Sequence, residues 1–397
     1  MFLKDKEIVL GVTGGIAAYK ALELTRLIVK AGGRVWPVMT AASTEFIRPL
    51  TLATLAGNPV STGLFDGSGE DHIALAKRAD LVIVAPATAN MIGKVASGIA
   101  DDLLSTVIMA TGAPVLFAPA MHANMYENPI VRGNIEKLIK LDYRFVGPEE
   151  GDLASGEEGM GRLTDPETIL DGAITSLTPQ GFRGERVLVT AGPTREAIDP
   201  VRFLSSRSSG RMGYAIAQAA RRRGATVNLV SGPSPHQPPE GVTVVRVTTA
   251  AEMAEATLTL YPSSSIVIMA AAVSDFRPRN VAGQKIKKGG APSPLELEVT
   301  EDILCEMGRR KEGQFLAGFA LETENIVDNA KKKLEEKGLD LIVANDTGGL
   351  DGPSNRVTLI EKNGHVEDIP LLSKEGAAGV LLDRISQMTA STTRKEP

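Results

Sequence analysis

Glycines and small hydroxyl-bearing residues follow three apolar runs in the first half of the chain, where a loop could hold a phosphate. Glycine lets backbone N–H groups approach an anion closely, and small side chains leave room for a flat ring. The same residues could form plain strand-to-helix turns, and their spacing is not the GxGxxG of a dinucleotide site. The loop residues that we expect to bind a flat phosphorylated cofactor are Gly14, Gly15, Ile16, Ala17, Thr40, Ser43, Thr88, Ala89 and Asn90.

The second half of the chain carries a different set of groups, which could bind a triphosphate. Ser208, Ser209 and Gly210 stand just before a helical pattern, where they could hold an anion or simply cap the helix. A buried apolar run leads to Asp275, and Lys285 follows in a lysine-rich segment. An acidic side chain with lysines at one sheet edge could bind a phosphate chain, whereas a lysine cluster alone is usually a solvated loop.

The order of apolar runs and amphipathic segments predicts the framework that positions these loops. Short apolar runs alternate with helical patterns in both halves, which is typical of α/β domains with doubly wound parallel sheets. Ligands bind such sheets at the carboxyl ends of the strands, where all of these loops are placed. The strands are expected at 8–12, 34–39, 81–85, 115–118, 186–190, 226–230, 266–272 and 341–344, and the helices at 17–30, 212–223 and 325–337.

Length, charge and cysteine content limit the kinds of protein that this chain can be. Its 397 residues suggest two domains, and the Pro- and Gly-containing segment Thr178–Glu185 marks the expected boundary between domains 1–180 and 186–390. The net charge of -5 gives no electrostatic reason for a nucleic-acid partner. No apolar run reaches the ~20 residues of a membrane span, and Cys305 is the only cysteine. We therefore expect no membrane partner, no disulfide and a cytoplasmic location.

The first half resembles a known enzyme family over nearly its whole length. The family is that of the homo-oligomeric flavin-containing cysteine decarboxylases, and the resemblance is carried by GVTGGIAAYK, DHIALAKRADLVIVAPATANMIGKVASGIADDLLS and PAMHANMYENP. It implies a flavodoxin-like variant of the Rossmann-like fold, an FMN cofactor that lies between subunits, and His72 as the base. It also implies that Met121, His122 and Met125 contact the substrate.

The chemistry implied by this resemblance is the loss of carbon dioxide from a C-terminal cysteine. A cysteine carboxylate alone has no electron sink for the carbanion that decarboxylation leaves. In the family the flavin oxidises the thiol to a thioaldehyde, decarboxylation gives an enethiol, and the reduced flavin returns a hydride. Histidine suits the accompanying proton transfer because it exchanges protons near neutral pH. Without the family pattern, a lone histidine beside an aspartate at a helix start would more commonly be a capping or surface residue.

Two positions of the first half differ from the family pattern. His122 stands where the substrate-binding signature has an asparagine, although an imidazole can still hydrogen-bond a carboxylate. Ser155, in the glycine-rich segment 151–162 that resembles a flexible flap, replaces the cysteine that serves the final reduction in well-known members. Because a hydroxyl is a far weaker acid than a thiol, the proton donor is open. Another group or a water could replace the thiol, or the reaction could stop at an oxidised enethiol.

The second half resembles the phosphopantothenate–cysteine ligase domain across nearly all of residues 186–390. The resemblance is carried by TAGPTRE, DPVRF, SSGRMG, AAVSDFRP, KIKK, GFALET and LIVAND. It implies that a nucleotide activates the carboxylate of phosphopantothenate as an acyl-nucleotide, which the amine of cysteine then attacks. Mg²⁺ and lysines would offset the phosphate charge. By analogy with the bacterial enzymes of this domain order, the nucleotide is CTP.

The same resemblance assigns roles to residues of the second half. Lys285 is expected to stabilise the reacting phosphate, and Asp275 to bind both the nucleotide and the metal ion. Ser206 stands where the family has an asparagine that contacts the acyl intermediate, and its side chain reaches less far. The other expected substrate contacts are Arg207, Ser208, Ser209 and Gly210, and the other expected nucleotide contacts are Ala271, Phe319, Lys333, Lys337, Asn345 and Asp346.

Together the two resemblances imply a bifunctional enzyme of coenzyme A biosynthesis. They also imply a homo-oligomer, in which trimers of the first domain and dimers of the second build a dodecamer. Substitutions at His122, Ser155 and Ser206 leave open a ligase fused to a decarboxylase that does not complete its reaction. A non-enzymatic flavin-binding scaffold would need neither His72 nor Lys285. A dinucleotide oxidoreductase would need GxGxxG and an acidic residue ~20 positions later, and the sequence does not arrange them so.

Overall fold

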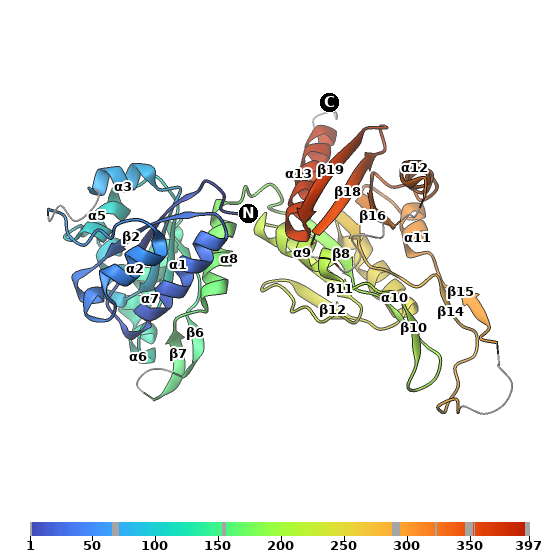
Figure 1. Cartoon of the computed structure of the whole chain (residues 1–397), viewed down its shortest axis with the longest axis horizontal. Helices are drawn as coiled ribbons and strands as arrows, with labels where there is room; N and C mark the ends of the chain where they lie inside the picture. Colours follow the sequence, from blue (N-terminus) through green and yellow to red (C-terminus); the bar gives the residue numbers. More distant parts are fainter. Residues whose placement is uncertain are drawn as a thin grey trace. The chain divides into compact units, whose positions relative to one another are not determined.

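The computed structural model describes residues 2–65, 71–152, 156–287, 294–321, 324–345, 352 and 354–393 of the chain. The chain forms two compact units, Met1–Thr178 and Pro179–Pro397, each with its own sheet and its own hydrophobic cores (Figure 1). Among the described residues, no helix has both the length and the apolar character needed to cross a bilayer.

The first unit is built around a five-stranded parallel sheet with the strand order β2-β1-β3-β4-β5. This is the order of flavodoxin-like doubly wound folds, so the fold class predicted for this half is confirmed. The sequence pattern predicts every strand except the two-residue β5. The strands are β1 (Glu7–Val12), β2 (Arg34–Met39), β3 (Leu81–Ala87), β4 (Val115–Pro119) and β5 (Arg144–Phe145).

Helices cover both faces of this sheet because its strands are apolar on both sides. In β1, Ile8 and Leu10 pack into one core while Val9 packs into the other, as expected for side chains that alternate across a strand. The first core is closed by α1 (Lys20–Lys30), α2 (Pro49–Ala56) and α8 (Pro166–Leu177). The second core is closed by α3 (His72–Arg78), α4 (Ala89–Ala96), α5 (Leu103–Ala110) and α7 (Pro129–Lys140).

Short elements complete the first unit. The predicted helix 17–30 is divided, because a 3-10 turn, η1 (Ile16–Tyr19), leads into α1. The segment that resembles a flap forms an antiparallel hairpin of β6 (Glu149–Asp152) and β7 (Glu158–Arg162). The remaining short elements are η2 (Ala41–Glu45) and α6 (Ala123–Glu127).

The second unit contains an eight-stranded sheet with the order β12-β11-β8-β13-β16-β17-β18-β19. Neighbouring strands are parallel as far as β17, and β18 and β19 then add an antiparallel edge that the sequence pattern does not predict. The strands are β8 (Arg186–Ala191), β11 (Thr226–Ser231), β12 (Thr243–Arg246), β13 (Ile266–Met269), β16 (Phe315–Leu321), β17 (Leu341–Asn345), β18 (Ser354–Glu361) and β19 (Val366–Ser373).

Strand β13 ends three residues earlier than the sequence pattern predicts. The N–H of Ala271 donates to the side-chain hydroxyl of Thr190 in β8 at 3.1 Å, and Ala272 forms an isolated bridge with Pro193. The chain therefore leaves the sheet at Ala270 and forms a loop at the carboxyl edge.

The helices of the second unit also lie on both faces of its sheet. One core contains side chains of α9 (Arg211–Arg222) and α13 (Lys374–Thr393). The opposite core contains side chains of α10 (Ala250–Leu260), α11 (Ile303–Arg309) and α12 (Ile326–Glu336), with η3 (Tyr261–Ser263) beside them. Two antiparallel hairpins stand apart from the main sheet, β9 (Arg195–Ala197) with β10 (Phe203–Ser205), and β14 (Phe276–Pro278) with β15 (Leu297–Val299).

We predict that Gly213→Ala destabilises the second unit, because α9 crosses β8 with no space for a methyl group. A Cβ at Gly213 would lie 2.5 Å from Ala191 Cβ and 2.7 Å from Thr190 O. The expected loss is about 1–3 kcal/mol of unfolding free energy, measured by urea denaturation, and it outweighs the higher helix propensity of alanine. Gly283→Ala is the control, since a Cβ there would meet nothing within 4 Å. Equal effects of the two substitutions would contradict this packing.

Candidate active sites

The first unit has a cavity of about 1010 Å³ at the edge of its sheet where the strands end. All the residues predicted to bind a cofactor line it except Ser43, namely Gly14, Gly15, Ile16, Ala17, Thr40, Thr88, Ala89 and Asn90. Ser43 is buried instead, and its hydroxyl donates to the carbonyl oxygen of Thr40 at 2.7 Å. Ser43 therefore shapes the loop that presents Thr40 to the cavity.

A threonine hydroxyl joins two of the loops around this cavity. Thr13 donates from Oγ1 to the carbonyl oxygen of Pro86 at 2.7 Å and accepts from the N–H of Thr88 at 3.1 Å. A Cβ at Gly14 would lie 2.5 Å from Ala42 Cβ, whereas one at Gly15 would meet only Thr88 Cγ2 at 3.9 Å. Gly14 thus permits two loops to pack together, and Gly15 leaves space that a ligand can occupy.

The substrate-binding signature and the flap hairpin are in direct contact. The N–H of Met121 donates to the carbonyl oxygen of Gly161 at 3.0 Å. Gly161 has φ +152°, and a Cβ there would lie 2.1 Å from the Met121 oxygen, so only glycine fits. His122 Nδ1 accepts from the N–H of Asn124 at 3.2 Å, which leaves Nε2 to donate to Glu157 Oε2 at 2.7 Å. The His122 imidazole therefore bridges the start of α6 and the flap.

Of the expected substrate and catalytic residues of the first unit, some line the cavity and others do not. Met121, His122 and Met125 line it. His72 begins α3, is half-buried, and is not among the lining residues. The side chain of Asp71 caps this helix by accepting a hydrogen bond from the N–H of Ala74 at 2.7 Å. Ser155 lies outside the described residues.

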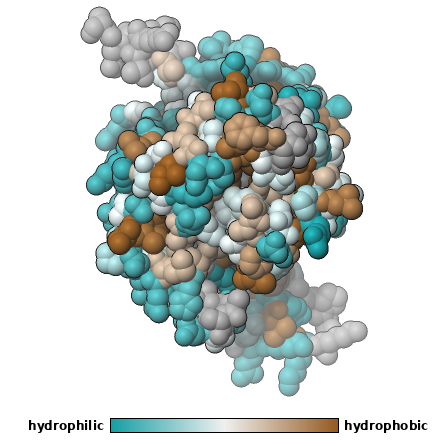
Figure 2. Space-filling model, turned by 90° about the vertical axis from the view of Figure 1, so that its left-hand side faces the viewer, coloured by the Kyte–Doolittle hydropathy of each residue, from teal (hydrophilic) through white to brown (hydrophobic). Residues whose placement is uncertain are grey.

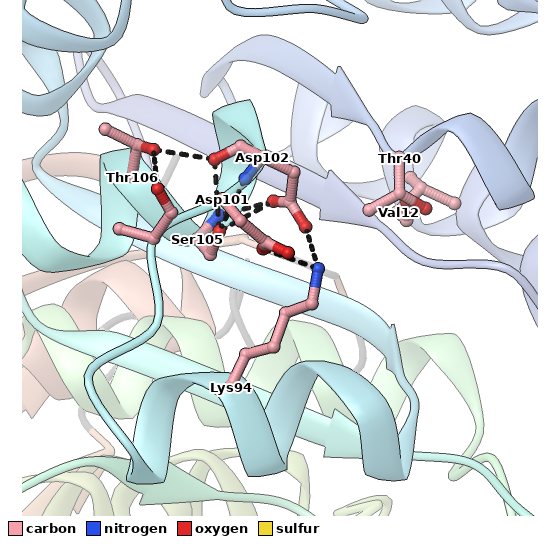
Figure 3. Close-up of polar contacts among 8 residues, drawn as sticks. Val12, Thr40, Lys94, Asp101, Asp102, Ser105 and Thr106 are labelled. Carbon is pink, nitrogen blue, oxygen red and sulfur yellow. Dashed lines mark hydrogen bonds and ion pairs between the residues drawn. The ribbon is translucent and has the colours of Figure 1, made fainter.

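A charged cluster at the cavity includes two lining residues that the sequence reasoning missed, Lys94 and Asp102. Figure 3 shows the Lys94 side chain reaching from α4 toward two carboxylates, and its Nζ lies 2.7 Å from Asp101 Oδ1 and 2.8 Å from Asp102 Oδ2. Asp102 also caps α5 by accepting from the N–H of Ser105 at 2.8 Å. This reciprocal capping box, Asp102 with Ser105, is a signal that the sequence does contain.

Lys94 and Asp102 are both charged at neutral pH. Hydrogen bonds to Asp101 and Asp102 raise the pKa of Lys94 above its ordinary value. Burial favours the protonated form of Asp102, but hydrogen bonds from Lys94 and Ser105 outweigh it and lower the pKa of this carboxyl. One positive and one negative charge of this cluster therefore line the cavity, and Asp101 stands beside them.

The second unit has a cavity of about 440 Å³ at the carboxyl edge of its sheet. The predicted residues that line it are Ser208, Ala271, Asp275, Phe319, Lys333, Lys337 and Asn345. Lining residues that the sequence reasoning missed include Asp302, Asn355 and Lys374, of which the last two come from the unpredicted antiparallel edge and the helix after it. Asp346 lies outside the described residues.

Threonine hydroxyls fix the loop that follows β13 at this cavity. The N–H groups of Ala271 and Ser274 donate to Thr190 Oγ1 at 3.1 Å and to Thr194 Oγ1 at 3.0 Å. The Ser205 hydroxyl donates to the carbonyl oxygen of Thr194 at 2.6 Å and so joins β10 to the segment between β8 and β9 that carries Thr194. These bonds place Asp275 one residue beyond a fixed backbone position.

Lysine and aspartate form an ion pair inside this cavity. Lys337 Nζ lies 2.8 Å from Asp302 Oδ2, and Asp302 caps α11 by accepting from the N–H of Cys305 at 3.0 Å. Burial opposes ionisation of Asp302, but the hydrogen bonds from Lys337 and Cys305 outweigh it and lower the pKa of the carboxyl. Within the described ranges, no group of three histidine, cysteine or acidic side chains could hold a metal ion by itself.

Several predicted residues of the second unit do not line this cavity. Ser206 and Arg207 are exposed, and Ser209 and Gly210 hold the turn before α9, where Ser209 O accepts from the Ser234 hydroxyl at 2.8 Å. Lys285 is also exposed and outside the cavity.

The loop around Lys285 is nevertheless anchored by a buried aspartate. Asp199 Oδ2 accepts from the N–H of Ile286 at 3.2 Å, and Arg202, which pairs with Asp199, donates to the carbonyl oxygen of Ile286 at 2.9 Å. The hydrogen bonds from Arg202 hold the pKa of Asp199 well below its usual range. The DPVRF segment therefore positions the backbone next to Lys285.

Comparisons with known proteins cover both units. A family model described as "Flavoprotein" matches residues 2–178, and one described as "DNA/pantothenate metabolism flavoprotein C-terminal domain" matches residues 182–388. Relatives named coenzyme A biosynthesis bifunctional protein CoaBC include that of Bacillus subtilis, which is 46% identical over 98% of this chain and 99% of its own length. The Escherichia coli relative is 44% identical over 97% of this chain and 98% of its own length. A crystal structure of the C-terminal domain of a CoaBC protein is 46% identical, covers 53% of this chain and 99% of that chain, and has a TM-score of 0.47.

We predict that Asp102→Ala destabilises the first unit in a pH-dependent way, because it removes both the cap of α5 and a partner of Lys94. The expected loss at pH 7 is about 1–2 kcal/mol of unfolding free energy. Folding lowers the pKa of this carboxyl, so the ionised group stabilises the folded protein. This stabilisation is complete above the pKa of the unfolded chain, about 3.9, and is lost as the pH falls through the lower pKa of the folded protein.

Denaturation of the wild type and the variant at pH 7 and pH 3 measures this effect. The difference between the two proteins should shrink at pH 3. Asp101→Ala is the control, since Asp101 is more exposed and does not cap the helix, and it should cost less than about 0.5 kcal/mol. If the loss of unfolding free energy in Asp102→Ala is the same at both pH values, the charge of the Asp102 carboxylate is not its cause.

Proposed function

This chain belongs to the family of coenzyme A biosynthesis bifunctional proteins, and from that membership we propose which residues of each unit carry its two reactions. It is a bifunctional enzyme, a phosphopantothenate–cysteine ligase and a phosphopantothenoylcysteine decarboxylase. The observation that carries this conclusion is the similarity to the Bacillus subtilis relative along almost the whole chain. We assign the decarboxylase to residues 1–180 and the ligase to residues 186–390.

FMN is the proposed cofactor of the first cavity, and the residues there fit it. A flat ring needs the space that Gly15, Ala17 and Ala89 leave, and the hydroxyls of Thr40 and Thr88 can meet its polar atoms. When bound, the flavin supplies the electron acceptor for the substrate thiol, so that the carbanion left by decarboxylation has an electron sink. The match of residues 2–178 to the Flavoprotein model supports this cofactor.

The side chains around this cavity have separate roles in the proposed decarboxylation. Met121 and Met125 hold the apolar part of the substrate, and the His122 Nε2–H donates to its carboxylate. In the structure that N–H donates to Glu157 of the flap, and since both acceptors are carboxylates, substrate binding would replace this contact. His72 is the base that takes a proton from the substrate, and Ser155 stands in the sequence where relatives have the group that serves the final reduction.

The second cavity is proposed to bind CTP and Mg²⁺. Lys333 and Lys337 can offset phosphate charge, and Phe319 offers a flat apolar surface to the base. Magnesium usually takes one or two protein carboxylates together with phosphate oxygens, so Asp275 with the nucleotide could hold it without a larger acidic cluster. Lys285 stabilises the reacting phosphate as the carboxylate of phosphopantothenate attacks, and the amine of cysteine then displaces the nucleotide.

A homo-oligomer, with trimers of the first unit and dimers of the second, is part of the proposal. Its support is that His72, Lys285 and Arg207 are not among the residues that line these two cavities, and that Ile16 and Tyr19 at the first cavity are largely exposed. Figure 2 shows apolar side chains dispersed among polar ones on the face of the first unit that it presents. The single cysteine and the soluble substrates favour the cytoplasm as the location.

We predict that His72→Asn and Lys285→Gln separate the two reactions. His72→Asn should lower decarboxylation about 100-fold or more, so that phosphopantothenoylcysteine accumulates, because the general base is lost. Lys285→Gln should lower ligation about 100-fold or more and leave the decarboxylation of supplied phosphopantothenoylcysteine unchanged. Mass spectrometry of the products, with CTP and ATP compared, measures both rates.

Each variant serves as the control for the other, and flavin absorbance shows whether His72→Asn still binds FMN. Wild-type phosphopantetheine formation by His72→Asn would contradict the assignment of the base. Wild-type ligation by Lys285→Gln would contradict the role of Lys285 and leave the two enzyme activities in place.

A further inference from the structure

A buried amide in the ligase unit has a hydrogen-bonding group that the protein does not use. Asn355 is the second residue of β18, is 3% exposed and lines the second cavity. Among the described parts of the chain, no group donates a hydrogen bond to its Oδ1. A buried amide oxygen without a donor destabilises a folded protein, so it indicates a group that a bound ligand completes.

The local backbone supports a binding role for this residue. The pairing of β18 with β19 shifts register between Asn355 and Val357, where the strand has an irregularity. Such bulges are common beside active sites, where they redirect a side chain. On the other side Val357 pairs with Asn345 of β17, which also lines the cavity. Two asparagines from adjacent strands therefore line the same cavity.

The phosphates of a bound nucleotide cannot be the hydrogen-bonding partner of Asn355 Oδ1. An amide oxygen and a phosphate oxygen are both acceptors, so they repel each other, and the lysines of the cavity are the groups that suit phosphate. Those lysines are Lys333, Lys337 and Lys374, and Lys374, 4% exposed, begins the helix that follows the same antiparallel edge. Asn355 therefore needs an N–H or O–H donor from another part of the ligand.

The neighbouring residues favour the nucleoside as the source of that donor. Phe319 of β16 pairs with Val343 of β17, so its ring lies two strands away from Asn355 at the same cavity. Planar bases stack on aromatic side chains, and amide side chains read the polar edges of bases. Ala270 and Ala271 also line this cavity, and their small side chains leave space for a base.

We propose that Asn355 Oδ1 accepts a hydrogen bond from the nucleoside of the bound nucleotide, and that Asn355 is a specificity-determining residue of the ligase. This inference rests on the proposed nucleotide-dependent ligation. The donor is an exocyclic amine of the base or a hydroxyl of the ribose. The amine and the hydroxyl would each donate a hydrogen bond to Oδ1. Nucleotides that lack one of these two groups distinguish them.

The test is Asn355→Leu in the full-length protein, with a readout that a purely structural asparagine would not give. Leucine has nearly the same shape and removes an unpaired polar group, so the variant should unfold at the wild-type temperature or higher without nucleotide. With saturating CTP the wild type should gain stability, and most of that gain should be absent in the variant. The KM for CTP should rise about tenfold or more, while decarboxylation of supplied phosphopantothenoylcysteine stays unchanged.

Nucleotide analogues identify the donor. If the base amine donates, the wild type should prefer CTP over UTP, and Asn355→Leu should lose that preference. If the ribose donates, the preference for CTP over 2′-deoxy-CTP should be lost instead. Asn280→Leu is the matched control, because Asn280 is exposed and outside the cavity.

Three results would overturn the inference. They are wild-type CTP affinity in Asn355→Leu, a loss of stability in this variant without nucleotide, and a wild type that discriminates against neither analogue. A wild type that forms no phosphopantothenoylcysteine with CTP or ATP would instead contradict the proposed ligase reaction, so the two failures are distinguishable.

Discussion

Threonine hydroxyls at the ends of the first strand of each unit hold the loops that form both cavities. Thr13 joins the loop after β1 to the loop after β3, and Thr190 and Thr194 hold the loop after β13. A chain that leaves a parallel sheet loses its strand partners, and its N–H groups then need other acceptors. A hydroxyl supplies one acceptor within the protein. The loops keep a defined shape while the space beside them stays open for a ligand.

The two units use this arrangement for ligands of different chemistry. The first cavity is the larger, and glycine, alanine and threonine form much of its wall, with the charged cluster of Lys94 and Asp102 on one side. The second cavity is smaller and brings together Asp275, Asp302 and several lysines. The first set suits a flat cofactor that carries its own reactivity, and the second suits a triphosphate whose charge must be offset.

The sequence predicts the parts of the fold that depend on local pattern. Strands such as β3 and β4 are buried on both faces and appear as continuous apolar runs, and the loops after them contain the lining residues Thr88 and Met121. The antiparallel edge of β18 and β19 has no comparable signal, because β19 lies at the sheet margin and Ile369 is its one buried residue. Lys374 and Asn355 reach the second cavity through that edge and were therefore missed.

Other site residues could not be found because tertiary contacts give them their role. Lys94 enters the first cavity through its pairing with Asp101 and Asp102, and spacing along one helix does not predict that pairing. In contrast, His72 and Lys285 are named by family resemblance, and neither is among the residues that line the two cavities described above. Their placement supports the proposed homo-oligomer, in which a second copy of the chain would complete each site.

One chain carries out ligation and then decarboxylation, with serine at position 155. The most direct measurement supplies the wild-type protein and FMN with phosphopantothenate, cysteine, Mg²⁺ and CTP, and identifies the end product by mass spectrometry. We predict 4′-phosphopantetheine as that product. Accumulation of phosphopantothenoylcysteine, or of its oxidised enethiol, would contradict a complete decarboxylase in the first unit.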